Sequence, residues 1–182
     1  MTAATEATEA LPAVKLGPFD ENFLADCPYG LDALMFDELL ECDVEASRVV
    51  ASWPTHDELP LTRSQRTHPQ RHPRHVSGGL MVHATGMLGF VHAYHVLGLR
   101  HHQGWIGYGT HIHRVVFRKL VTPGSPIIST CTATRVRKGK TRYFVRYEFE
   151  FRHEGQLCYE GEQSAMWNRL GDEDANGVEG LL

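Results

Sequence analysis

The sequence predicts an α+β domain in which an antiparallel sheet curves around one long helix. Residues 78–97 have apolar side chains at helical spacing and on nearly every side, and a helix that is apolar all round is a buried helix. Two segments of strand character precede this helix, four follow it, and no segment repeats another. A lone helix among strands buries all of its faces only if the sheet wraps around it.

The residues before the central helix predict one short helix, two strands and a loop. Asp20–Asp26 is expected to be helical with Asp20 as its N-cap. Ala33–Glu41 and Ala46–Trp53 are expected to be strands joined by a tight polar turn. Residues 55–75 are expected to form a long exposed loop, because prolines interrupt any regular element there. These prolines, with the one just before the loop, are Pro54, Pro60, Pro69 and Pro73.

The central helix and the strands after it complete the predicted domain. Gly86, Gly89 and Ala93 give the helix a small-residue face that another backbone can approach closely. Beyond the helix, apolar and polar residues alternate as they do in half-buried strands, and glycine-containing turns separate the segments. An antiparallel meander is therefore expected. Its four strands are Tyr108–Arg118, Pro126–Val136, Thr141–Arg152 and Gln156–Trp167.

Length and composition fit one globular domain of a cytoplasmic protein. The chain has 182 residues, of which 42% are hydrophobic and 22% charged. Residues 19–170 are assigned to the domain, whereas residues 1–18 and 171–182 have the composition of disordered tails. The N-terminus lacks the basic start and apolar run of a signal peptide, and no membrane span is expected. The four cysteines are far apart in the sequence, so we expect reduced thiols.

The net charge of −4 conceals a strong asymmetry along the chain. Residues 59–147 contain 14 Lys and Arg, 10 of the 12 His, and no Asp or Glu. Either the acidic flanks neutralise this segment in the folded protein, or the segment binds an anionic ligand. The sequence pI near 6.3 and the lack of a known nucleic-acid-binding module argue against nucleic acid as that ligand.

The run Arg74-His75-Val76-Ser77-Gly78-Gly79-Leu80, which leads into the buried helix, resembles the hotdog superfamily of acyl thioesterases and hydroxyacyl dehydratases. The chain is most similar to the FcoT-like long-chain acyl-CoA thioesterases and next to the FabZ-type dehydratases. The resemblance implies the hotdog fold, a homodimer or dimer-based oligomer, and an acyl thioester of coenzyme A or acyl carrier protein as ligand. The other matching pieces are Pro28-Tyr29, Val116-Phe117-Arg118-Lys119, Pro123-Gly124 and the segment from Arg142 to Asn168.

The same resemblance assigns candidate catalytic residues around the start of the helix. Ser77, Gly78 and Gly79 are expected to bind the thioester oxygen, because the opening N–H groups of a helix lack intrahelical partners. His75 and His83 are the candidate bases. The loop histidine of FcoT-like enzymes falls on His75, and the helix carboxylate of FabZ-type dehydratases falls on His83. The acid of Gly-Gly hotdog thioesterases falls on Gly86, so this chain lacks the usual carboxylate.

Further residues are expected to bind the substrate, and neither a cofactor nor a metal is expected. Tyr29, His68, Thr85 and Gly86 would line the acyl site, with Thr85 positioning a water molecule. The candidate cations for the phosphates of coenzyme A, or for an acidic carrier protein, are Arg71, Arg74, Arg118 and Lys119.

The reaction is left open among three hypotheses. The first is hydrolysis of a fatty acyl-CoA or acyl carrier protein thioester. The second is dehydration or hydration of a 3-hydroxyacyl thioester, with His83 in place of the usual acid. The third is a non-catalytic acyl-binding subunit.

Overall fold

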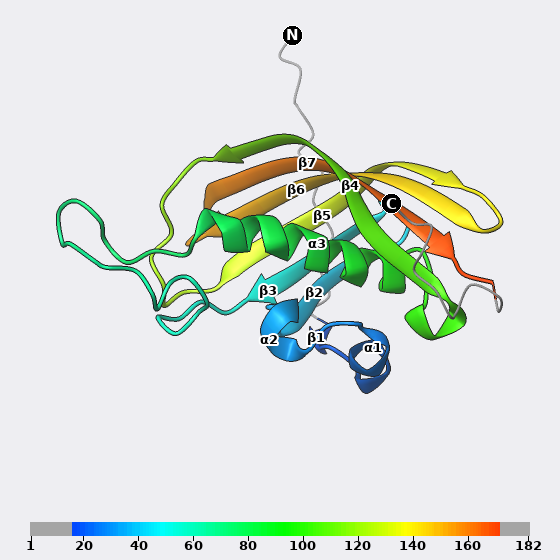
Figure 1. The fold of residues 1–182 in the computed structure, drawn as a ribbon, viewed down its shortest axis with the longest axis horizontal. Helices are drawn as coiled ribbons and strands as arrows, with labels where there is room; N and C mark the ends of the chain where they lie inside the picture. The colour runs from blue at the N-terminus through cyan, green and yellow to red at the C-terminus, as the bar shows by residue number, and fades with distance from the viewer. Residues whose placement is uncertain (1–15, 172–182) are drawn as a thin grey trace, which may run out of the picture.

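The computed structural model describes residues 16–171, in which one antiparallel sheet curves over helix α3 (Gly78–His95) (Figure 1). The strand order across the sheet is β1-β2-β3-β5-β6-β7-β4. The strands are β1 (Gly17–Pro18), β2 (Glu38–Asp43), β3 (Arg48–Trp53), β4 (Trp105–Phe117), β5 (Ile127–Lys138), β6 (Arg142–His153) and β7 (Gln156–Arg169). The shorter helices are α1 (Glu21–Asp26), α2 (Leu31–Leu34) and the 3₁₀ turn η1 (His101–Gln103). The predicted hotdog fold is confirmed.

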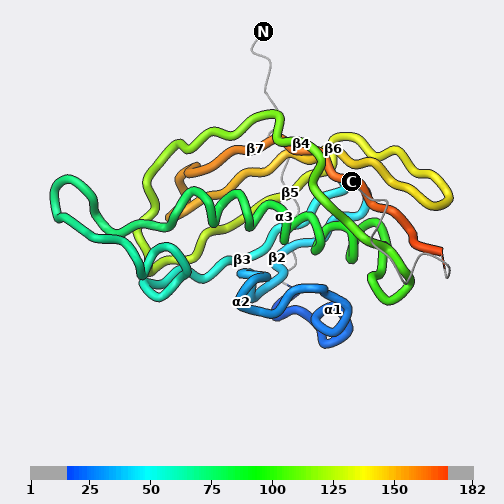
Figure 2. Tube along the Cα trace, viewed as in Figure 1, coloured from blue at the N-terminus to red at the C-terminus, as the bar shows by residue number. Residues whose placement is uncertain are grey.

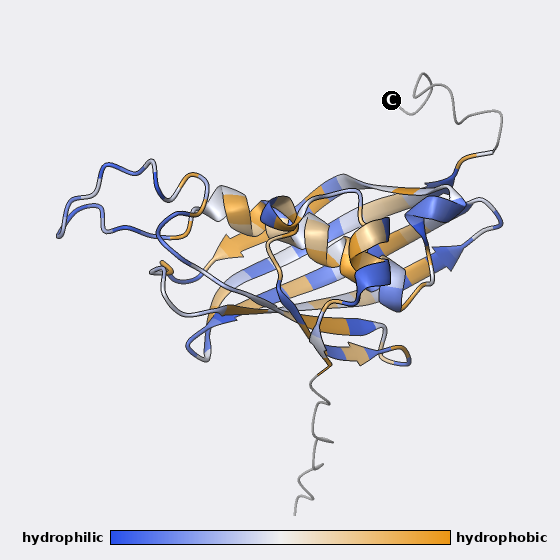
Figure 3. Cartoon of the chain, turned by 90° about the horizontal axis from the view of Figure 1, so that it is seen from below, coloured by the Kyte–Doolittle hydropathy of each residue, from blue (hydrophilic) through white to orange (hydrophobic). Residues whose placement is uncertain are grey.

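Helix α3 forms where the sequence predicts it and is buried on most sides. The Ser77 hydroxyl caps its N-terminus by accepting a hydrogen bond from the Gly79 N–H. Ten of its residues are buried, and the apolar ones pack against the inward-facing side chains of the sheet. Figure 3 shows hydrophobic residues along the helix and along the strands that curve around it. The helix thus occupies the space that a curved sheet would otherwise leave empty.

The segment before β2 differs from the prediction. Ala33–Glu41 was expected to be one strand, but helix α2 occupies its start and β2 begins only at Glu38. Leu34, Met35 and Phe36 are all buried in succession, whereas a strand with one exposed face would bury alternate residues. Met35 adopts a left-handed conformation, with a φ of 68°, and ends the helix. Helix α1, by contrast, is confirmed with Asp20 as its N-cap.

The expected meander of four consecutive strands is also wrong. Strand β4 pairs with β7 at one edge of the sheet, and β5 pairs with β3 instead of with β4. The chain therefore crosses from β4, at one edge of the sheet, to β5, at its centre. This crossover extends the sheet over the side of α3 that β2 and β3 leave uncovered (Figure 2). It also leaves β4 as an edge strand.

The loop between β3 and α3 extends beyond the end of the helix, as Figure 1 shows. Its tip contains a single bridge between His68 and His72, and it otherwise lacks regular strands or helices. The predicted tails lie outside the described residues except for 16–18 and 171, and Gly17 and Pro18 pair with β2. All four cysteines are free thiols. No helix in residues 16–171 is long and apolar enough to cross a membrane.

Candidate active site

A cavity of about 410 Å³ lies at the N-terminus of α3. It brings together four residues that the sequence singled out, from two distant segments: His75 and Gly78 from the start of the helix, and Arg118 and Lys119 from the end of β4. The backbone N–H of Val76 donates to the carbonyl of Val121, at 2.8 Å, and so ties the two segments together. The remaining lining residues are apolar: Val76, Met81, Phe117, Leu120 and Val121.

The start of α3 leaves one backbone donor available to a ligand. The Gly79 N–H donates to the Ser77 hydroxyl at 3.3 Å, so these two predicted residues satisfy each other. The Gly78 N–H has no acceptor in the part of the chain that the structure describes. A Cβ at position 78 would lie 2.8 Å from the ring of Phe117, so only glycine fits without moving that ring. Gly78 therefore lines the cavity with a backbone N–H that has no acceptor among residues 16–171.

The imidazole of His75 has one nitrogen in a hydrogen bond and one without a partner among residues 16–171. Its Nδ1 lies 2.9 Å from the carbonyl oxygen of Pro73, and because a carbonyl only accepts, Nδ1 carries the proton. Nε2 is then the basic nitrogen of the neutral ring. The Gln65 side chain accepts from the His75 N–H at 3.1 Å and donates to the His75 carbonyl at 2.9 Å. The backbone of His75 is thus held on both sides by Gln65, a residue that the sequence did not single out.

The predicted cations differ in how they are paired. Arg118 donates to the carboxylate of Glu160, which also lies 3.6 Å from Arg114. Lys119 lines the cavity and makes no ion pair within residues 16–171. Arg74 lies 3.9 Å from Asp57, and its side chain is 36% exposed. Of the cations at the cavity wall, Lys119 is therefore the one left for an anionic ligand.

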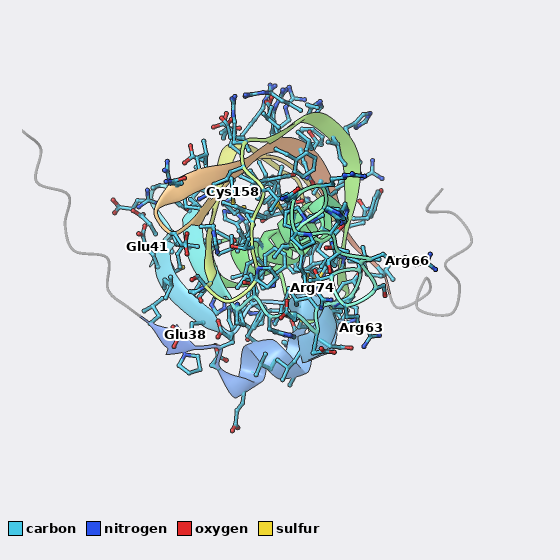
Figure 4. All side chains as sticks on the ribbon, turned by 90° about the vertical axis from the view of Figure 1, so that its left-hand side faces the viewer. Glu38, Glu41, Arg63, Arg66, Arg74 and Cys158 are labelled. Carbon is cyan, nitrogen blue, oxygen red and sulfur yellow. The ribbon has the colours of Figure 1, made fainter. Side chains whose placement is uncertain are left out.

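The other predicted basic residues of the long loop, His68 and Arg71, do not line the cavity. His68 accepts hydrogen bonds at Nδ1 from the backbone N–H groups of Gln70 and Arg71, at 3.2 and 3.1 Å. His68 therefore stabilises the loop tip and does not line the acyl site. Figure 4 shows Arg63 and Arg66 at the rim of the molecule, directed outward.

His83 and Tyr29 lie together outside the cavity. The Nε2 of His83 is 2.8 Å from the carbonyl oxygen of Ala33, to which it donates. The Tyr29 ring lies edge-on to His83, with a centroid distance of 6.3 Å, and packs edge-on against Phe90. The structure thus separates the two candidate bases, and His75 is the one beside the helix N-terminus.

Thr85 and Gly86 line a second, smaller cavity further along α3. It encloses about 60 Å³ between the helix, β4, β6 and β7. The Nε2 of Gln163 on β7 donates to the Thr85 hydroxyl at 2.6 Å. The sequence did not single out Gln163, because nothing in a strand's alternation indicates which helix residue it will face. A Cβ at Gly86 would meet no atom within 4 Å.

No cluster of three or more His, Cys, Asp or Glu suited to a metal ion exists in residues 16–171. His111 and His113 stack with centroids 5.8 Å apart, but the Nε2 of His113 is hydrogen-bonded to Ser164 at 2.7 Å. His92 is fully buried and hydrogen-bonded to Ser47 and Tyr147. Burial lowers the pKa of His92 to about 4, so this histidine is a neutral core residue.

Comparison with known proteins gives similarity in structure but none in sequence. No family model matches the chain, and no curated protein matches it. A mutant thioesterase from Pseudomonas aeruginosa has 15% identity and a TM-score of 0.56, with 87% of this chain and 100% of that chain covered. A thioesterase from Haemophilus influenzae has 16% identity and a TM-score of 0.55, with coverages of 86% and 96%.

A third solved structure, of a hypothetical protein mutant from Staphylococcus aureus, has 13% identity and a TM-score of 0.54, with 77% of this chain and 98% of that chain covered. These identities are low, so the likeness concerns the arrangement of the backbone. The particular similarity to FabZ-type dehydratases is not confirmed. Together with the sheet that wraps around one central helix, the likenesses place this chain among the hotdog-fold proteins.

Proposed function

We propose that this protein hydrolyses acyl thioesters of coenzyme A or of acyl carrier protein. The observation that carries the proposal is the cavity at the N-terminus of α3. Its lining residues include His75, Gly78 and Lys119. A base, an oxyanion donor and a cation beside an apolar surface are the groups that thioester hydrolysis requires. The named thioesterases among the structural neighbours support the same class of reaction.

In the proposed reaction each group has one role. The Nε2 of His75 takes a proton from water, and the water oxygen attacks the thioester carbonyl carbon. The developing oxyanion accepts a hydrogen bond from the Gly78 N–H, where the helix dipole also favours negative charge. Collapse of the tetrahedral intermediate breaks the carbon–sulfur bond, and the thiolate recovers the proton from His75. The products are a carboxylic acid and a free thiol.

The basic side chains would bind the other end of the substrate. Lys119, which lines the cavity, would bind a phosphate there, and Arg71 and Arg74 would add positive charge along the loop. The charge asymmetry of the sequence supports this assignment, because the acid-free segment supplies all three residues. Their common ligand would be the phosphorylated pantetheine of coenzyme A or of a carrier protein.

We further propose that the protein acts as a homodimer or a dimer-based oligomer. Strand β4 pairs with β7 on one side, and its other edge pairs with no strand among residues 16–171. Ile112 is opposite Gln163 and therefore faces the helix side of the sheet, yet it is 57% exposed. Phe117, further along the same strand, is 54% exposed. A long open edge bordered by exposed apolar side chains suits pairing with a second copy.

The decisive experiment incubates the protein with saturated acyl-CoAs and with 3-hydroxyacyl-CoAs of increasing chain length, and follows free thiol and enoyl absorbance together. Thiol release without enoyl formation is expected. Enoyl formation would instead identify a dehydratase, and the absence of both signals would identify a non-catalytic binder. Either of these results contradicts the proposal.

A further inference from the structure

The hairpin of β5 and β6 carries a dense cluster of cations that the proposed function does not use. Five of the eight residues from 135 to 142 are Lys or Arg, and all five are exposed. None of the five makes an ion pair with an acidic residue among residues 16–171. These hairpin cations are Arg135, Arg137, Lys138, Lys140 and Arg142.

Two of the hairpin cations lie on the outer face of the sheet, away from α3. Val136 of β5 is opposite Val145 of β6, which is fully buried. Successive side chains of a strand point to opposite faces, so Arg135 and Arg137, on either side of Val136, point outward. Positive charges gathered in this way repel one another. An anionic counterpart on this surface would therefore be stabilising.

The chain leaves the sheet beside these cations. Asn168 of β7 is opposite Arg142 of β6, and the Arg169 N–H donates to the carbonyl of Thr141 at 2.8 Å. Figure 1 shows the hairpin of β5 and β6 and the end of β7 at the same end of the molecule, opposite to the long loop. The residues that follow Gly171 are thus attached next to the hairpin cations.

The sequence after Gly171 has the opposite charge. Residues 172–182, which lie outside the described part of the chain, contain four Asp or Glu and no Lys, Arg or His. Eleven residues of extended chain reach at most about 36 Å, whereas β5 is two strands from β7, a separation of about 10 Å. The acidic residues can therefore reach all of the hairpin cations.

We infer that residues 172–182 bind to the hairpin cations of the same chain and so cover this basic surface against other anionic partners. Attachment beside the surface gives the segment a high effective concentration there, so several weak surface ion pairs suffice for binding. The inference is independent of the proposed function, because the cavity with His75 lies at the opposite end of the molecule. It assigns the hairpin part of the basic stretch to the chain itself and leaves the loop part for a ligand.

The test uses a carbodiimide, which joins a carboxylate to a lysine amine only where the two are in contact. In the full chain at low salt, cross-linked peptides should connect Lys138 or Lys140 to the acidic residues of 172–182. Lys119, which lines the cavity, is the internal control and should not be connected to them. In 1 M NaCl, where the Debye length is about 3 Å, most of these cross-links should be lost. No cross-link at the hairpin, or an equal yield at Lys119, would overturn the inference.

A pair of double variants separates docking from net charge. Arg135→Gln with Arg137→Gln leaves both hairpin lysines as probes and should lower the cross-link yield about tenfold, as the loss of two surface ion contacts gives. This variant should fold, because neither arginine side chain makes a hydrogen bond or an ion pair among residues 16–171. Arg63→Gln with Arg66→Gln removes the same charge from the other end of the molecule (Figure 4) and should keep the wild-type yield. Equal losses in the two double variants would refute docking at the hairpin.

The same reaction on a mixture of ¹⁵N-labelled and unlabelled protein shows which copy supplies the acidic segment. Cross-links between peptides of one copy are expected. If all cross-links join a labelled peptide to an unlabelled one, the segment binds to a second copy of the chain, and the inference is wrong.

Heparin, used as a model polyanion, tests whether the segment covers the surface. A variant that stops at Gly171 should need more NaCl for elution from a heparin column than the full chain does. This increase should become smaller when Arg135 and Arg137 are also changed to Gln, because the surface that the segment covered is then less basic. An increase of the same size in both backgrounds would mean that residues 172–182 do not cover these cations.

Discussion

The buried histidine of α3 should make the stability of this protein depend on pH. The Nε2 of His92 lies 3.1 Å from the carbonyl oxygen of Ser47, to which it donates, and its Nδ1 lies 3.2 Å from the Tyr147 hydroxyl. Nδ1 therefore accepts from Tyr147 in the neutral ring. Protonation would remove this acceptor and place a charge in the core. Burial lowers the pKa from 6.5 to about 4.

The sign and size of the effect follow from proton linkage. Below a pH of about 6.5 the unfolded chain binds a proton at this residue that the folded chain does not bind until about 4. The stabilising contribution is therefore complete above the higher value and is lost as the pH falls between the two. Lowering the pH from 7 to 5 should cost about 2 kcal/mol through this residue alone.

The assay is urea denaturation of the wild type and of His92→Gln at both pH values. Glutamine can donate to Ser47 and accept from Tyr147 but does not titrate, so the variant should lose about 2 kcal/mol less than the wild type over this interval. Burial also lowers the pKa of His95, and the comparison between variants removes that common contribution. His111→Gln, at an exposed position, should follow the wild type. Equal losses in wild type and His92→Gln would refute the reasoning.

Three predictions concern the proposed activity. His75→Ala should lower kcat about 100-fold with folding intact, as removal of a general base does. The control His72→Ala, which changes the ring that packs against His75, should keep full activity. If His75→Ala is as fast as the wild type, the base lies elsewhere. Arg71→Glu with Arg74→Glu should raise KM for acyl-CoA roughly tenfold at low salt and leave kcat unchanged, and an acyl-N-acetylcysteamine should not respond. Ile112→Lys should give monomers in sedimentation, and a monomeric wild type at micromolar concentration would contradict the dimer.

The elements that could be predicted from the sequence were those with a strong local signal. The buried helix and the last three strands have periodicities that match their environments, so Gly78–His95 and β5 to β7 lie where expected. The segment from 33 to 37 has no such periodicity. Its buried residues are consecutive because a short helix and a left-handed residue turn them all inward. Strand order depends on a crossover, which leaves no local trace in the sequence.

The residues of the candidate site also differ in how far the sequence could predict their positions. His75, Gly78, Arg118 and Lys119 come from two segments that the chain marks clearly, one at a Gly-Gly helix start and the other at a strand end, and the structure brings them into one cavity. The sequence also makes His83 a candidate base, because it occupies the helix position of the carboxylate in FabZ-type dehydratases. Its side chain nevertheless turns to the carbonyl of Ala33, because the face on which a helical residue lies depends on packing.

Near the middle of α3, where the usual carboxylate is missing, a polar side chain from β7 contacts the helix. Residue 163 on β7 reaches the Thr85 hydroxyl directly beside Gly86, where a Cβ would meet no atom within 4 Å. A glycine there leaves room for an amide that reaches in from the sheet, so the polar group of this region comes from a strand and not from the helix. An amide cannot act as a general base at neutral pH. The proposed base and this amide therefore lie at separate places along α3, His75 at its start and Gln163 near its middle.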